Sequence, residues 1–203
     1  MENGIAKPLA SEIANSGVSN GLRAAGIVLA GSLLVAACSH IALPLGFTPV
    51  PLTLQPFAVL LLGLLLAPRL AAATLGAYLL EGAIGLPVFA PGLVFGAGLA
   101  HLLGPTGGYL MTYPLAAALV SYLWRRSRRS YSAALLSAAA GDAAILLGGF
   151  AWLSVWTRGG GSPGSVTTAF AMAVVPFLPG EALKVAAAAA IARGLDRVRR
   201  SRQ

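Results

Sequence analysis

The chain has 203 residues, of which 57% are hydrophobic and 10% are charged, and its mean hydropathy is +0.80. Globular domains carry about 25% charged residues, and a small soluble protein cannot bury this much apolar surface. These values exclude a soluble enzyme and a disordered chain, and they indicate an integral membrane protein with several helices.

The formal net charge of +8 comes from short basic clusters that lie between long apolar runs. This pattern is typical of cytoplasmic loops in membrane proteins and argues against a nucleic-acid-binding surface. The lone cysteine, Cys38, lies inside an apolar run, and no set of cysteine and histidine residues has metal-ligand spacing. The chain has neither a P-loop nor a serine elbow, so we expect no metal, no cofactor and no ATPase or other catalytic site.

The first predicted span is Leu22–Leu45, preceded by a polar N-terminal tail over residues 1–21 that does not resemble a signal peptide. Pro44, Pro49 and Pro51 follow closely, and prolines at this density require an extended or turning backbone. Five further spans are predicted at Leu52–Ala67, Leu70–Leu86, Tyr109–Trp124, Tyr131–Trp156 and Gly180–Val198.

Residues 87–108, between the third and fourth spans, are rich in glycine and proline. The apolar stretch Leu93–Leu103 is too short to cross a bilayer, so we expect a re-entrant or interfacial segment there. Residues 199–203 form a basic C-terminal tail. The sequence therefore predicts an all-α membrane protein whose residues 22–198 form a domain of six transmembrane helices.

The basic residues predict the orientation of these spans. With the N-terminus inside, 12 of the 14 lysine and arginine residues fall on the cytoplasmic side, Arg158 falls outside, and Lys184 lies within the sixth span. The twelve are Lys7, Arg23, Arg69, Arg125, Arg126, Arg128, Arg129, Arg193, Arg197, Arg199, Arg200 and Arg202. The positive-inside rule then predicts that both termini are cytoplasmic.

Four ionisable residues lie inside predicted spans, where each is a functional hypothesis by default. Glu81 and Asp142 have either a structural role, in which a neighbouring hydroxyl satisfies the carboxylate, or a functional one, and of the two we expect the structural role. Glu181 and Lys184 are three residues apart and share one helix face at the outer end of the sixth span. They form either an ion pair that steadies the helix end or a ligand site. In the second case Lys184 captures a ligand carboxylate and Glu181 accepts hydrogen bonds from ligand N–H groups.

Other polar residues fall on the same outer side. Thr53 and Gln55 are two apart, so in extended backbone they point the same way. The segment Gly104–Tyr109 adds glycine backbone and an aromatic ring. Convergent polar groups beside an apolar bundle predict a small-molecule pocket. Its predicted lining is Thr53, Gln55, Gly107, Gly108, Tyr109, Glu181 and Lys184.

Small residues on the first span allow another helix to approach closely. Gly26 and Ala30 are four apart, and so are Ser32 and Ala36. They form either a packing face within the bundle or a docking face for another subunit.

Four segments, in this order, closely resemble the biotin-specific substrate-capture subunits (S components, the BioY family) of energy-coupling-factor transporters. The segments are Ile41–Gly46 with Pro49–Gln55, Gly82–Phe89, Gly104–Leu110, and Pro176–Glu181 followed by Lys184. Together they extend over nearly the whole membrane domain.

The resemblance implies a six-helix bundle with an outward-facing biotin pocket. Glu181 and Lys184 match an acidic residue and a lysine that contact biotin in the family, although the usual acid there is aspartate. The longer glutamate side chain moves the carboxylate outward. Thr53, Gln55 and Tyr109 match the family's loop motifs.

The resemblance also implies a function: high-affinity biotin binding and uptake across the cytoplasmic membrane of a prokaryote by a multi-pass subunit in the lipid bilayer. Its partners would be a transmembrane coupling subunit and two ATPase subunits, which hydrolyse the ATP. The alternative is a self-contained secondary transporter of biotin or a related vitamin that works without ATPase partners.

Overall fold

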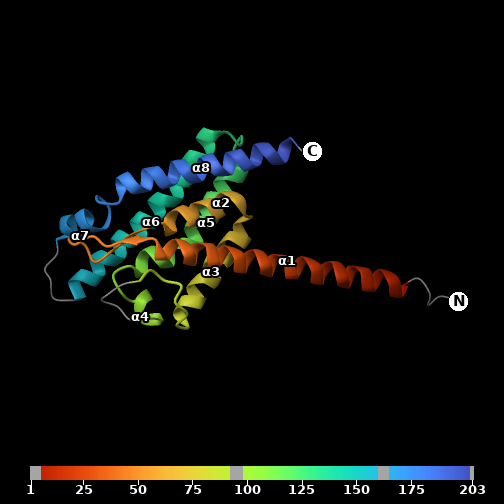
Figure 1. Cartoon of the computed structure of the whole chain (residues 1–203), viewed down its shortest axis with the longest axis horizontal. Coiled ribbons are helices and arrows are strands. Elements are labelled where there is room, and N and C mark those ends of the chain that lie inside the picture. The colour runs from red at the N-terminus through yellow and green to blue at the C-terminus, as the bar shows by residue number, and fades with distance from the viewer. Residues whose placement is uncertain (1–5, 92–97, 160–164, 202–203) are drawn as a thin grey trace.

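The computed structural model describes residues 6–91, 98–159 and 165–201, and over these ranges the chain forms eight helices and one two-stranded sheet. The elements are α1 (Ala6–His40), β1 (Ala42–Leu43), β2 (Leu52–Thr53), α2 (Gln55–Leu65), α3 (Pro68–Ala83), α4 (Leu99–Leu102), α5 (Gly107–Arg126), α6 (Tyr131–Gly159), α7 (Val166–Ala173) and α8 (Leu178–Arg200). They pack as a helical bundle, and the N-terminal half of α1 projects from it (Figure 1). The predicted all-α class is confirmed.

The two ends of the bundle differ in what they carry. The start of α1 and the end of α8 lie at one end, whereas the β-strands, α4 and α7 lie at the other (Figure 1). Termini on the same side agree with an even number of membrane crossings. The number six and the cytoplasmic side of the termini stay predictions.

Within the described residues, two helical segments are long and apolar enough to cross a membrane: Asn20–His40 and Tyr131–Thr157. A third is added if α7 and α8, bent by 45° at the break between them, count as one span. The apolar helix α2 has only 11 residues, or about 17 Å at the helical rise of 1.5 Å per residue. Alone it is shorter than the hydrocarbon core of about 30 Å.

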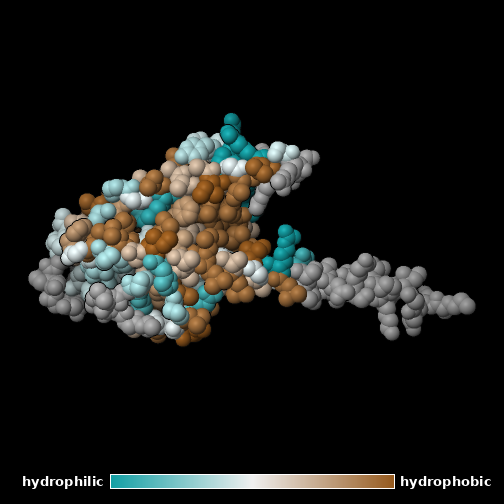
Figure 2. All heavy atoms as spheres, viewed as in Figure 1, coloured by the Kyte–Doolittle hydropathy of each residue, from teal (hydrophilic) through white to brown (hydrophobic). Residues whose placement is uncertain are grey.

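The outer surface of the bundle is apolar, as a membrane protein requires. Leu33, Leu115, Leu136 and Leu183 are between 65% and 73% exposed. Hydrophobic atoms also dominate the middle of the face shown in Figure 2, over α2 and α8. A surface of this kind is unfavourable in water, and acyl chains of a bilayer would cover it.

The first helix differs from its predicted bounds at both ends. It starts at Ala6, so most of the predicted polar tail is helical, and Pro8 stands in the first turn, where its missing N–H costs no hydrogen bond. The helix ends at His40, five residues before the predicted Leu45, because the prolines that follow require extended backbone. There β1 and β2 pair antiparallel, with Ala42 opposite Thr53.

The segment between the third and fourth predicted spans is partly described. Residues 93–97 of the predicted re-entrant stretch Leu93–Leu103 lie outside the described residues, and Leu99–Leu102 form the short helix α4. Helix α5 begins at Gly107, so Gly107 and Gly108 belong to its first turn and not to a loop. At the other end of the chain, α8 continues to Arg200, into the predicted basic tail.

The buried core has two parts. One lies beneath the strands and α7 and includes five aromatic side chains, Tyr78, Phe89, Tyr109, Tyr113 and Phe177. The other lies nearer the chain termini, around Leu60 and Trp124. Helix α5 packs against α2, α3 and α6, so it holds the centre of the bundle.

Candidate functional site

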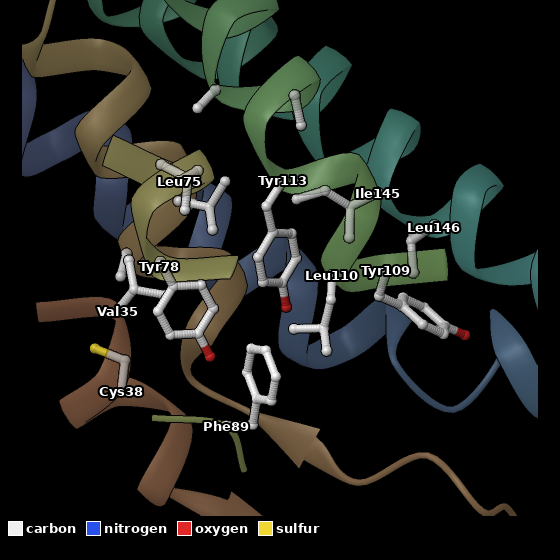
Figure 3. Packing of buried hydrophobic residues seen from close by; sticks show 14 of the residues in the cluster. Val35, Cys38, Leu75, Tyr78, Phe89, Tyr109, Leu110, Tyr113, Ile145 and Leu146 are labelled. Carbon is white, nitrogen blue, oxygen red and sulfur yellow. The ribbon is translucent and has the colours of Figure 1, made fainter. Parts of the chain in front are cut away.

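A buried amide organises the polar groups at the loop end of the bundle. Gln55 is the first residue of α2 and is only 4% exposed. Its Nε2 donates to the hydroxyl of Tyr78, which in turn donates to the Val88 carbonyl at 2.9 Å. The Thr53 hydroxyl donates to Gln55 Oε1 at 3.2 Å, and the Tyr113 hydroxyl lies 3.5 Å from the same oxygen. Figure 3 shows Tyr78 and Tyr113 pointing into the space above Phe89.

This network borders a cavity of about 40 Å³. Its lining comes from the α1–α2 connection, α2, α4, α5, α6 and α8 with the residues around them. The lining residues are Val50, Pro51, Thr53, Gln55, Pro56, Ala90, His101, Thr106, Tyr109, Leu110, Tyr113, Ile145, Leu146, Phe177 and Glu181. The structure thus brings Thr53, Gln55, Tyr109 and Glu181, four of the seven predicted site residues, to one cavity.

The other three predicted residues lie outside that lining. A side chain on Gly107 would collide with the Leu102 carbonyl, and one on Gly108 would lie 2.5 Å from the Gly148 carbonyl and strike Trp152. These two glycines therefore let α4 and α6 approach α5 closely. Lys184 is buried behind Glu181.

Glu181 and Lys184 form an ion pair at the start of α8. Lys184 Nζ donates to Glu181 Oε1 at 2.7 Å, and the two side chains are 8% and 5% exposed for lysine and glutamate. Pro179 stands in the first turn of this helix, as the sequence predicts. Because the two charged groups are in contact, both would face the same part of a ligand. Lys184 and Glu181 could contact opposite ends of one ligand only if their ion pair broke.

The two remaining intramembrane carboxylates behave differently. The Ser32 hydroxyl on α1 donates to Glu81 Oε1 on α3 at 2.9 Å, so the predicted hydroxyl partner of Glu81 is confirmed. The same prediction for Asp142 is wrong. Its Oδ1 meets no hydrogen-bond donor among the described residues, and Asp142 lines a groove between α6 and α8 together with Glu181.

Hydrogen bonds join the end of α7 to α5 and to the α1–α2 connection, both of which contribute residues to the cavity wall. The Tyr109 hydroxyl donates to the Ala173 carbonyl at 2.7 Å, and the Thr48 hydroxyl donates to the Met172 carbonyl at 3.0 Å. Because the hydroxyl of Tyr109 is already used, this residue offers its ring to the cavity.

His101 forms another part of the wall. Its ring stacks on Phe89, with centroids 5.0 Å apart and an interplanar angle of 25°. Burial lowers the pKa of His101 below its ordinary value of 6.5, so the ring is neutral at pH 7. It therefore offers an aromatic face and one hydrogen-bond donor and acceptor without charge.

Sequence reasoning missed Tyr78, Tyr113 and the role of Asp142. Tyr113 could have been found, since it lies four residues after Tyr109 and so on the same helix face. Tyr78 and Asp142 carry no comparable local signal, because their role depends on which helix lies opposite.

The small residues of α1 divide into two pairs. Gly26 and Ala30 are exposed, whereas Ser32 is fully buried and Ala36 is 8% exposed. Ser32 and Ala36 thus pack within the bundle, and Gly26 and Ala30 stay available as a predicted docking face. Cys38 is a free, buried thiol, and no group of three or more metal-binding side chains occurs in the described part of the chain.

A family model and individual relatives with known names match this chain, and all of them carry the name BioY. The model of the BioY family matches residues 10–201. The "Probable biotin transporter BioY" of Pyrococcus horikoshii is 38% identical over 148 residues, which cover 73% of this chain and 82% of that protein. The "Biotin transporter BioY" of Rhodobacter capsulatus is 38% identical over 184 residues, 86% of this chain and 93% of that protein.

A solved structure has the same fold. It is the crystal structure of the S-component for biotin from an ECF-type ABC transporter, with a TM-score of 0.77 and 24% sequence identity. The match covers 88% of this chain and 93% of that one.

Proposed function

The chain belongs to the BioY family, and from this premise we propose that it captures biotin at the outer face of a prokaryotic cytoplasmic membrane as the S component of an ATP-driven energy-coupling-factor transporter. The observation that carries the proposal is the family match over residues 10–201, which includes every element around the cavity. In this function the chain binds the vitamin, while a transmembrane coupling subunit and two ATPase subunits supply the energy.

The chemistry of the cavity suits biotin. The vitamin has a carboxylate, a ureido group with two N–H donors, and an apolar bicycle. The buried oxygens of Gln55 and Glu181 can accept from the ureido group, and Lys184 can neutralise a carboxylate if the ion pair rearranges. The rings of Tyr109 and Phe177, whose centroids lie 6.2 Å apart, offer an apolar surface to the bicycle.

The size of the cavity implies that biotin binding requires movement. A volume of about 40 Å³ holds a few water molecules, whereas pockets for small molecules measure roughly 300 Å³ or more. The α1–α2 connection lines the cavity, and the hydrogen bond from the Thr48 hydroxyl to the Met172 carbonyl joins it to α7. We propose that these segments move apart to admit the vitamin.

The test is calorimetry of biotin with the purified, detergent-solubilised chain and no partner subunit. We expect tight one-to-one binding, since the site lies within this chain. A folded sample that does not bind biotin would refute the proposal. Uptake into vesicles that contain this chain alone, compared with vesicles that also hold the coupling and ATPase subunits, then separates an ATP-driven subunit from a self-contained secondary transporter.

A further inference from the structure

Three charged side chains meet between α6 and α8. Asp142 on α6 is 7% exposed, and Glu181 and Lys184 on α8 are 4% and 7% exposed. Lys184 Nζ donates a hydrogen bond to Glu181 Oε1, and Asp142 and Glu181 line the same groove between α6 and α8. If every group were ionised, two negative charges and one positive charge would lie buried together. Such an excess charge is expensive in an apolar environment.

One oxygen of each carboxyl group needs a donor. Asp142 Oδ1 and Glu181 Oε2 are buried and meet no hydrogen-bond partner among the described residues, although both carboxyl groups belong to residues that line the same groove. An ionised carboxylate only accepts hydrogen bonds, so two of them can bond to each other only through a proton that one of them holds.

The neighbouring side chains do not supply the missing donor. On α5, the Tyr109 hydroxyl donates to the Ala173 carbonyl and the Tyr113 hydroxyl is directed at Gln55 Oε1. Helices α2 and α7, which also contact α6, carry no titratable residue. The titratable groups that face Asp142 are therefore Glu181, Lys184 and Tyr113, with Tyr109 beside Glu181.

We propose that Asp142 and Glu181 share one proton in the ligand-free protein, and that Asp142 is thereby a positioning residue that holds Glu181 at the cavity wall. One shared proton gives the two carboxyl groups a hydrogen bond to each other and leaves the three groups electrically neutral. Two carboxyl groups that share a site and one proton are a known arrangement. Here the shared proton connects Asp142 on α6 to Glu181 on α8. Together with Lys184 the two carboxyl groups form a cluster without net charge beside the ligand cavity.

The shared proton makes biotin binding depend on pH, and this part of the inference rests on the proposed function. Loss of the proton at alkaline pH leaves one excess negative charge at the site and removes the bond that orients Glu181. Binding of an anionic ligand then requires the proton to return. Linkage to one proton weakens the affinity by about tenfold for each pH unit above the point of release.

Infrared spectroscopy of the ligand-free protein tests the proton itself. We expect a carbonyl band from a buried, protonated carboxyl group in the wild type, and we expect Asp142→Asn to remove it. The amide of this nearly isosteric variant donates to Glu181 without a titratable proton. Glu81→Gln is the matched control, since Glu81 is also a carboxyl inside a helix but is bonded to Ser32, and the band should stay. A wild-type spectrum without the band would overturn the proposal, whether or not any variant folds.

Calorimetry with biotin over a range of pH tests the consequence. The wild type and Glu81→Gln should lose affinity at alkaline pH, and Asp142→Asn should bind with a nearly constant affinity. Equal pH dependence in all three proteins would overturn the positioning role of Asp142. If none of them binds biotin, the proposed function fails, while the infrared result still decides whether the proton is shared.

Discussion

Replacing Lys184 by methionine separates the two roles that the Glu181–Lys184 pair can have. Methionine keeps most of the apolar stem of lysine and removes the charge. The lysine and glutamate side chains are only 8% and 5% exposed. Their contribution to the free energy of unfolding is therefore that of a buried ion pair, and not the value of about 0–1 kcal/mol for surface pairs. Breaking a buried pair costs about 3–5 kcal/mol, since the remaining charge is left without compensation. We expect the free energy of unfolding in detergent to fall by this amount. The fall is smaller if Glu181 takes up a proton, because its charge is then neutralised.

The double variant Lys184→Met with Glu181→Gln decides between the roles. Both charges are then absent, and replacing a buried pair by neutral side chains of similar size is often neutral or stabilising. We therefore expect its thermal stability to return to near the wild-type value. If Lys184 or Glu181 contacts biotin, affinity stays reduced by at least about thirtyfold, which corresponds to the lower end of the 2–5 kcal/mol for a lost buried charge contact.

Thermal unfolding gives the stability of each variant, and calorimetry with biotin on the same preparations gives its affinity. The ligand-site interpretation is refuted if the double variant is stable and binds biotin within a few fold of the wild type. The pair would then only steady the start of α8.

Three further predictions test other parts of the structure. Gln55→Leu should weaken biotin binding at least tenfold in calorimetry, because it removes a buried acceptor for the ureido N–H groups, and leaving a buried donor unpaired costs about 1–3 kcal/mol; unchanged affinity would exclude this amide from the site. His101→Phe keeps a ring against its aromatic neighbour and should remove a pH dependence of thermal stability. Burial lowers the pKa of His101 below 6.5, so the unfolded chain binds the proton more readily and the wild type loses stability as the pH falls below about 6.5. Gly63→Ala should lower the free energy of unfolding by about 1–3 kcal/mol, because its new methyl group would lie 2.9 Å from the Ala117 carbonyl. Gly76→Ala is the matched control, since no atom lies within 4 Å of that position, and it should be neutral or slightly stabilising.

Local patterns in the sequence were sufficient for much of the fold. Apolar runs predicted the long helices, and Pro44, Pro49 and Pro51 predicted the break that became the β-hairpin. Helix ends were less predictable where apolar residues continue past a helix, as after His40. The polar character of residues 1–21 concealed a helix that begins at Ala6, because helix propensity does not depend on apolar content.

The candidate site was predictable where neighbours in sequence are also neighbours in space. Glu181 and Lys184 lie one helical turn apart, and Thr53 and Gln55 are joined by a hydrogen bond across two residues. Gly107 and Gly108 lie at close helix contacts outside the cavity lining, since glycine serves close helix packing as well as loops that approach a ligand. Their position near Tyr109 in sequence did not place them on the cavity.

Asp142 shows why the rest could not be predicted from one sequence. Its own surroundings on α6 are small and apolar, and they offer no partner at helical spacing. Its partner lies about 40 residues later in the chain, and only the packing of α6 on α8 brings the two carboxyl groups together. The same packing changes the expected effect of a mutation. A structural carboxylate satisfied by a hydroxyl would be dispensable for binding, whereas a carboxyl group that shares a proton with Glu181 is not. Asp142→Ala should therefore weaken biotin binding more than Asp142→Asn does, because only asparagine keeps a donor for Glu181 Oε2.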